Sequence, residues 1–360
     1  MFLQFTTQVQ QTISSARCID VSINPKQVWT HDQPNMEEKM LKSISLVIFC
    51  SATLYLILFF FVSAYAGESE QARFSGYILV GGAYSSGDPS LDDASTTKNR
   101  RITSLSQSPK KLSEFSLVAL GELNYTFAST GTTLSLGSDG GSGLFSISQP
   151  FNETGTFSLG LNFMADEVWQ DPFIIGTDRA KTDRETKGLI LSWDNILNSG
   201  FNFSYSVDDI DVENDAAGNR NQNLKRDGKR HTVKGGSCLF ATDTQELSTG
   251  IIFEQANMDG KSFSYDGYGL ELNHIFKGED WDIETGLSLV YHDYNLPHPE
   301  FNKTRKENIF SLESAYTLHD PFGFKNYFIT VFGSYARSNS NINFYDDSLL
   351  STGAGVGYSF

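Results

Sequence analysis

Histidines and carboxylates are the residues of this sequence with the greatest capacity for chemistry. Beyond residue 66 the histidines are His231, His274, His292, His298 and His319. A hydrolytic site would need one of them beside a serine and an asparagine, or beside an aspartate that shares the acid–base work. His292 is followed by Asp293 near the expected outer end of a strand, and we interpret the two as an interfacial polar pair. The sequence therefore predicts no catalytic residues and no enzyme.

A run of carboxylates is the best candidate for binding a cation. Its members are Asp208, Asp209, Asp211, Glu213 and Asp215. The run lacks the D-x-D-x-D-G pattern of a calcium loop, so we interpret it as a solvated outer loop that divalent ions can bridge to anionic lipopolysaccharide. His292 and His298 lack the spacing of a helical zinc site, and Cys238 is the lone cysteine beyond residue 66. No metal site and no cofactor are predicted.

The elements that would position these residues are β-strands. From about residue 73 onward, apolar and polar residues alternate with a period of two, as in strands that have two different faces. In the segment 201–208, for example, Phe, Tyr and Val alternate with Asn, Ser and Asp. The chain beyond residue 66 has no comparable stretch with a helical period. The fold class is all-β.

A membrane-spanning barrel explains these strands better than a soluble β-sandwich. Sandwich strands are about five or six residues long, whereas many segments here reach roughly nine to eleven, which is the length that a tilted strand needs to cross a bilayer. Short joints near 128–131, 242–245 and 277–280 alternate with long ones near 86–113, 169–187, 212–230 and 296–306. Short turns and long loops at opposite ends are typical of outer-membrane barrels. We predict a transmembrane antiparallel up-and-down β-barrel.

About fourteen strands are predicted. They lie near 73–85, 114–127, 131–137, 143–150, 155–168, 187–194, 200–211, 229–241, 246–257, 262–276, 281–295, 307–318, 327–338 and 349–360. The third, fourth and sixth are weak, and the alternative count is twelve. An even count of strands returns both termini of the barrel to the periplasmic side and places every long loop on the outer side.

The last strand carries a local signal for membrane insertion. Ala354, Val356, Tyr358 and Phe360 alternate with small polar residues and glycines up to the final residue. A terminal Phe preceded by apolar or aromatic residues at every second position resembles the signal that the outer-membrane insertion machinery recognises. This machinery is a predicted partner during biogenesis.

The N-terminal segment predicts export. The apolar run Ile44–Val62 follows Lys39 and Lys42 and precedes an Ala-Tyr-Ala sequence at 64–66, which together resemble a signal peptide cleaved after Ala66. An uncleaved anchor helix is the alternative. We therefore divide the chain into 1–39, a non-structural extension or a mis-chosen start, 40–66, the signal peptide, and 67–360, the barrel. The predicted location is the bacterial outer membrane.

Charge and face together predict the lining of the lumen. The formal net charge is −16, and it stays −16 without the first 66 residues, which hold four basic and four acidic residues. This balance disfavours nucleic acid as a partner. If apolar residues face lipid, the alternate positions face inward, and the charged ones are Glu122, Asp208, Lys234, Glu254, Glu271, Glu284 and Glu313. The inward carboxylates of the ninth to twelfth strands could form an acidic wall that favours cations, or could simply brace the barrel.

Aromatic residues near strand ends fit the aromatic girdles of a membrane barrel. Trp169, Trp193 and Trp281 are the tryptophans assigned to this role, with core packing as the alternative.

Several stretches carry a resemblance to a family. They are 122–127 (ELNYTF), 167–173 (EVWQDPF), 264–268 (SYDGY), 303–306 (KTRK), 320–324 (DPFGF) and 341–346 (NINFYD). With these stretches the chain resembles a family of functionally uncharacterised outer-membrane proteins of Gram-negative bacteria, a domain of unknown function. The resemblance covers roughly 73–360. It implies the architecture, and it implies no catalytic residue.

Two functions are consistent with these observations. The first is a channel or porin-like barrel for small polar or cationic solutes, with loops such as 86–113 or 169–187 folding inward. The second is a non-conducting envelope-structural or surface-binding barrel whose acidic outer loops contact lipopolysaccharide or a partner.

Overall fold

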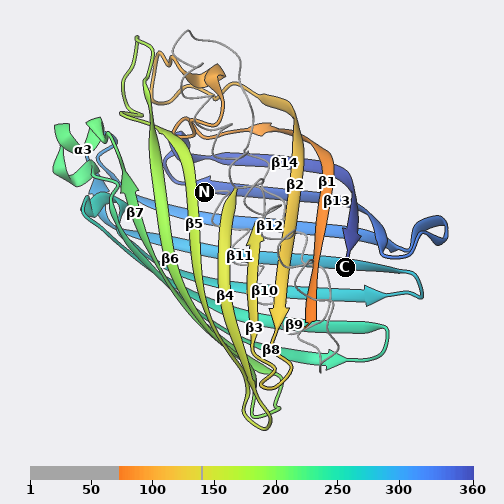
Figure 1. The fold of residues 1–360 in the computed structure, drawn as a ribbon. Helices are drawn as coiled ribbons and strands as arrows, with labels where there is room; N and C mark the ends of the chain where they lie inside the picture. Colours follow the sequence, from red (N-terminus) through yellow and green to blue (C-terminus); the bar gives the residue numbers. More distant parts are fainter. Residues whose placement is uncertain (1–72, 139–140) are drawn as a thin grey trace. The chain divides into compact units, whose positions relative to one another are not determined.

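The computed structural model describes residues 73–138 and 141–360, which form one closed antiparallel β-barrel (Figure 1). Within these ranges the barrel has fourteen strands, so the predicted fold class is confirmed and the alternative count of twelve is wrong. The predicted extension and signal peptide, 1–66, lie outside the described residues.

The strands follow the predicted segments closely. They are β1 (Arg73–Asp88), β2 (Leu112–Thr126), β3 (Thr133–Ser138), β4 (Ser142–Phe151), β5 (Gly155–Trp169), β6 (Lys181–Ile196), β7 (Phe201–Val212), β8 (Gly228–Ala241), β9 (Gln245–Met258), β10 (Tyr265–Lys277), β11 (Trp281–His298), β12 (Lys303–His319), β13 (Tyr327–Ser340) and β14 (Asp347–Ser359). Short helices lie between them: α3 (Ala216–Arg220), η1 (Thr97–Asn99), η2 (Gln222–Leu224), η3 (Lys261–Phe263), η4 (Pro321–Gly323) and η5 (Asn343–Tyr345).

Each strand pairs with its neighbours in sequence, and β1 pairs with β14 to close the ring. Tyr77 lies opposite Ser359 across this closing seam and opposite Glu122 on β2. Closure gives every strand two hydrogen-bonded partners. No strand edge is then left with unpaired N–H and C=O groups, which lipid could not hydrogen-bond.

The two faces of the wall differ as the alternation predicts. Large apolar side chains such as Ile78, Leu117 and Ile251 are exposed on the outside, while their sequence neighbours face inward. An apolar exterior over a polar interior is the pattern of a barrel that crosses a bilayer. Among the described residues no helix is both long and apolar enough to cross a membrane.

Long loops and short turns lie at opposite ends, which we call the loop end and the turn end. The loop end carries residues 89–111, 170–180 and 213–227. Two predicted long loops are shorter than expected, because β6 begins at Lys181 and because only 299–302 separate β11 from β12. These strand ends carry polar residues on both faces. The alternation of polarity therefore disappears there, although the strands remain paired with their neighbours.

An apolar cluster lines the inside of the closing seam. Its members, from β1, β2 and β13, are Leu79, Ala83, Val118, Leu120, Phe328 and Phe332, with Tyr77 and Ala315 against it. The rings of Phe328 and Phe332 lie where a Cβ would be on Gly357 and Gly353 of β14. Glycines in the last strand therefore leave space for the aromatic rings of its neighbour.

Candidate functional site

The loop end is closed by an apolar cluster that we call the cap. Its buried members are Leu91, Ile102, Phe173, Ala217, Leu224, Ile342, Phe344 and Tyr345, with Leu105, Phe263 and Phe301 packed against them. The rings of Phe173 and Phe344 approach to 5.4 Å. They belong to the β5–β6 and β13–β14 loops, which lie on opposite sides of the ring of strands. Because these loops meet, the cap must cross the whole mouth of the barrel.

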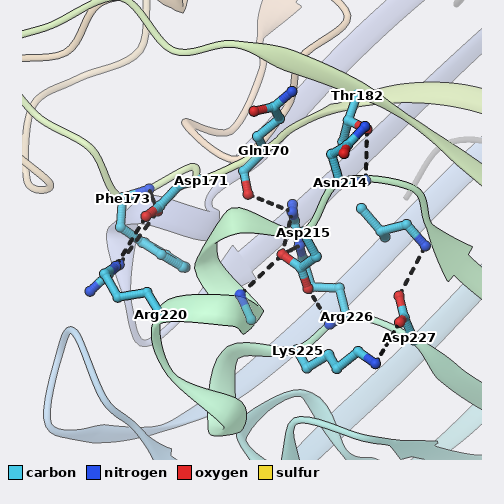
Figure 2. Close-up of polar contacts among 12 residues, drawn as sticks. Gln170, Asp171, Phe173, Thr182, Asn214, Asp215, Arg220, Lys225, Arg226 and Asp227 are labelled. Atoms are coloured by element: carbon cyan, nitrogen blue, oxygen red, sulfur yellow. Dashed lines mark hydrogen bonds and ion pairs between the residues drawn. The ribbon is translucent and has the colours of Figure 1, made fainter.

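Ion pairs tie the β7–β8 loop into the cap (Figure 2). Asp215, just before α3, accepts a 2.7 Å hydrogen bond from Arg226, and Arg226 also donates to the carbonyl of Gln170 at 3.1 Å. Arg220, on α3, reaches Asp171 at 3.1 Å and Glu300 at 2.6 Å. The β5–β6, β7–β8 and β11–β12 loops are thereby linked.

A cavity of ≈ 180 Å³ lies beneath the cap. Its charged lining comprises Asp92, Asp93, Asp166, Glu167, Arg184, Arg226, Arg230, His292, Arg305, Glu307 and Asp347. Residues 90 and 92–94 of the β1–β2 loop share this lining with inward-facing strand residues. The loop therefore enters the mouth of the lumen.

A row of neighbouring charges, which we call the belt, comprises Glu254, His292, Glu307 and Arg305, and the last three line this cavity. Glu254 lies 2.9 Å from His292 Nε2, and Glu307 lies 3.9 Å from His292 Nδ1. A neutral imidazole presents a lone pair at one nitrogen, whereas the imidazolium is a donor at both. Two facing carboxylates therefore favour the charged form of His292.

Glu307 is the most connected member of the belt. It accepts hydrogen bonds from Arg305, from the Tyr294 hydroxyl at 3.1 Å and from the Ser338 hydroxyl at 3.3 Å. Arg305 also lies over the ring of Tyr345 at 3.6 Å. The belt thus joins β9, β11, β12 and β13 to the cap.

A second ion pair extends the charges around the wall. Arg230 on β8 donates to Asp208 on β7 at 2.5 Å, and both side chains are buried. A Cβ on Gly188, opposite Asp208, would collide with Asn162 and Asp208, just as one on Gly267 would lie 2.8 Å from the His292 ring. Glycines at inward positions make room for long polar side chains to meet across strands.

Toward the turn end the lumen carries a surplus of acid. Lys234 donates to Glu271 at 2.9 Å. Glu313 lies opposite Gly286 on β11, and Glu284 lies two residues further along the same strand. Glu122 also faces inward and accepts a 2.6 Å hydrogen bond from Asn124. We call Glu271, Glu284 and Glu313 the lower acidic group.

The structure thus places all of the predicted lumen residues on the inner face, since directly opposite partners share a face. It does not bring the four carboxylates of the acidic wall together. Glu254 lies opposite Gly267, four residues from Glu271 along β10, which is about 13 Å at strand rise. Glu254 and Glu271 each hold a cation of the protein, so the predicted wall is divided into two levels.

Other predictions are corrected. His292 faces the lumen, whereas Asp293 pairs with Lys306 on the outer face, so the two do not form a pair. The carboxylate run is not one solvated loop, because Asp208 and Asp215 are buried in ion pairs while the three members between them are exposed.

Trp169 is not a girdle residue, because it is completely buried and donates through Nε1 to the Asp93 carbonyl at 3.0 Å. Trp193 is exposed on the outer face. The insertion-signal residues Ala354, Val356, Tyr358 and Phe360 are all exposed on the outer face of the last strand.

The sequence alone does not identify the four arginines of the site, Arg184, Arg226, Arg230 and Arg305, or the carboxylate Glu307. All of these except Arg226 lie at inward positions of predicted strands or their extensions. Glycines opposite charged residues were the available signal. In the described ranges no three or more His, Cys, Asp or Glu side chains group as a metal site would require.

The chain has distant similarities to proteins of known structure. Solved structures similar to it include a loop-deletion mutant of OmpT, an outer membrane protein of Vibrio cholerae (9% identity, TM-score 0.38, covering 81% of this chain and 99% of that one). Another is an outer membrane channel from Pseudomonas putida F1 (9% identity, TM-score 0.39, covering 82% and 98%). At these scores neither supports an inference about activity. A search of curated proteins finds no match.

A family model described as "Protein of unknown function (DUF2860)" matches residues 74–359, which is most of the chain and nearly all of the barrel. The resemblance seen in the sequence is confirmed, and the chain belongs to this family.

Proposed function

We propose that this protein is a channel of the Gram-negative outer membrane that admits small polar or cationic solutes. The observation that carries the proposal is the lumen, which presents charged and hydrogen-bonding side chains from the cavity beneath the cap to the lower acidic group. Charged side chains are tolerated in a wet barrel interior and are expensive on the lipid face. In this proposal the cap lies across the outer opening of the channel.

Preference for cations comes from the lower acidic group in this proposal. Glu254 and Glu307 of the belt are balanced by His292 and Arg305. The lower acidic group has three carboxylates, and one of them, Glu271, accepts a hydrogen bond from Lys234. Rings of carboxylates of one sign favour cations over anions in a narrow lumen.

The double variant Glu284→Gln, Glu313→Gln is expected to lower the cation-to-anion permeability ratio several-fold, because it removes the negative surplus and keeps side-chain size. The measurement is the reversal potential in a salt gradient across a planar bilayer. Glu185→Gln, at an exposed carboxylate of the outer face, is the control and should leave the ratio unchanged. An unaltered ratio in the double variant would rule out the lower acidic group as the source of selectivity.

A second function is favoured by one observation, the cap itself. An apolar cluster that crosses the whole mouth suits a non-conducting envelope or surface-binding barrel. In that case the exposed carboxylates Asp209, Asp211 and Glu213 at the loop end would contact lipopolysaccharide through divalent ions. The insertion machinery would recognise the outer face of β14 under either function.

The proposed function does not include catalysis. Both nitrogens of His292 face carboxylates, and its ring stacks on Tyr265 at 4.1 Å, so the imidazole is occupied by contacts within the protein. A His292→Ala variant that lost lipid or peptide hydrolysis by the parent protein would revive an enzymatic function.

A further inference from the structure

The β1–β2 and β5–β6 loops are joined by backbone hydrogen bonds, including a bridge between Arg101 and Asp178, and by one buried arginine side chain, Arg179. Its guanidinium donates to the carbonyl of Leu91 at 2.7 Å, to that of Pro172 at 2.8 Å, and to that of Asn99. Its backbone N–H donates to the Arg100 carbonyl at 2.8 Å. Two of the three carbonyls that accept from the Arg179 side chain, those of Leu91 and Asn99, lie in the β1–β2 loop. Arg179 therefore holds that loop at two separate positions.

The position of this loop decides whether the cavity is covered. Leu91 belongs to the cap and donates through its backbone to the Phe344 carbonyl at 3.1 Å, while its neighbours Ser90 and Asp92 line the cavity. The loop thus lies between the lumen and the outside. Releasing it from the β5–β6 loop would uncover the cavity.

Arg179 differs from the other arginines of the cap in how its charge is balanced. Arg220 and Arg226 each pair with a carboxylate, whereas within the described residues Arg179 forms no ion pair and its Nε is buried without a hydrogen-bond partner. It is 1% exposed and lies 4.4 Å from the centre of the Trp169 ring. Burial lowers the pKa of Arg179 to about 10, and the more distant Asp92 and Asp171 offset this only in part.

A buried charge that is balanced by neutral carbonyls is costly to desolvate. The same guanidinium would recover its full hydration if the loops separated. Among the contacts that join the two loops, those of the Arg179 side chain are therefore made by a buried charged group that gains hydration when the loops separate. The contact between the two loops therefore has several hydrogen bonds from Arg179 that stabilise it, and a charged group that water stabilises once the contact breaks.

We propose that Arg179 is the positioning residue of a gate, which holds the β1–β2 loop against the β5–β6 loop and opens the lumen when these bonds break. The inference rests on the proposed channel function and names the regulation of that same lumen. Arg179 acts through the loop and not by touching the solute.

The first test compares Arg179→Ala with Arg100→Ala in the full chain, reconstituted in lipid bilayers. Arg100 is the matched control, because it also joins the β1–β2 loop to the β5–β6 loop, but through an exposed ion pair with Asp178, and such a pair contributes little. Hydrogen exchange of residues 89–111 reports the loop, and single-channel open probability in KCl reports the gate. For Arg179→Ala we expect exchange at least tenfold faster and an open probability several-fold higher, with the heat-dependent gel shift of the folded barrel unchanged. Arg100→Ala should resemble the parent protein.

A second test covers the case in which Arg179→Ala fails to fold. Arg101 and Asp178 form an antiparallel bridge between the two loops, where Cα atoms lie within disulfide range. The pair Arg101→Cys, Asp178→Cys, with the native cysteines changed to serine, should lose channel openings when oxidised and regain them with a reductant. Openings that persist in the oxidised protein would overturn the gate.

The outcomes separate the gate from the channel. Unchanged exchange and unchanged open probability in Arg179→Ala would overturn the role of Arg179 and leave the channel in place. Faster loop exchange without conductance in any variant would overturn the channel function and the gate with it. Faster exchange together with more frequent opening would support both.

Discussion

Replacing Glu307 with glutamine is expected to lower the free energy of unfolding by about 3–5 kcal/mol, the usual effect of breaking a buried charge pair from one side. Glu307 is 1% exposed, and the change would leave Arg305 and the His292 imidazolium with one carboxylate fewer between them. Denaturant unfolding of the barrel in lipid vesicles, followed by tryptophan fluorescence, measures the effect.

The matched control is Glu167→Gln, which removes a carboxylate paired with Lys181 in an exposed position. Exposed pairs contribute about 0–1 kcal/mol. Equal losses in the two variants would show that the belt is solvated and that the cavity beneath the cap is not a closed space. A loss confined to Glu307→Gln would support the belt as the main internal brace at the loop end.

Replacing Phe328 with alanine should destabilise the barrel by about 3–5 kcal/mol, as for other buried aromatic truncations. Phe328 is 1% exposed and its ring covers Gly357 on the last strand, so truncation leaves a cavity on the inner side of the seam region. Phe328→Leu keeps most of the volume and should lose no more than about 1.5 kcal/mol. The same unfolding experiment reports both variants.

Phe322, in the turn just before β13, provides the comparison. It is 91% exposed, and its replacement with alanine should change stability by no more than about 0.5 kcal/mol. If Phe328→Ala were as mild as Phe322→Ala, the apolar cluster inside the seam would not be holding the last strand in place.

Strands were predictable from the sequence wherever the two faces meet different surroundings. Segment 200–211 alternates because one face meets lipid and the other meets the lumen, and its boundaries agree with those of β7 to within a residue. The start of β6 was missed because Thr182 and Arg184 face inward while Asp183 and Glu185 face out at the loop end. Both faces are polar there, so the periodicity that reveals a strand is absent.

The site was predictable only as single residues. Alternation assigns Glu254 and Asp208 to the inner face, but their partners depend on register, and His292 lies 38 residues from Glu254 in sequence. One change of register by two residues would exchange every partner. The cap is even less predictable from the sequence, because Phe173 and Phe344 come from loops on opposite sides of the barrel and meet across its mouth.

Single-channel recording can compare the full chain with a variant in which residues 95–108 are replaced by a short Gly-Ser linker. This change removes Ile102 and Leu105 from the cap, together with the Asn99 carbonyl that accepts from Arg179, and keeps the strands. We expect the parent protein to be mostly closed, with brief, cation-preferring steps, and the variant to conduct steadily. A variant that is folded and inserted but silent would contradict the proposed channel and favour a non-conducting barrel.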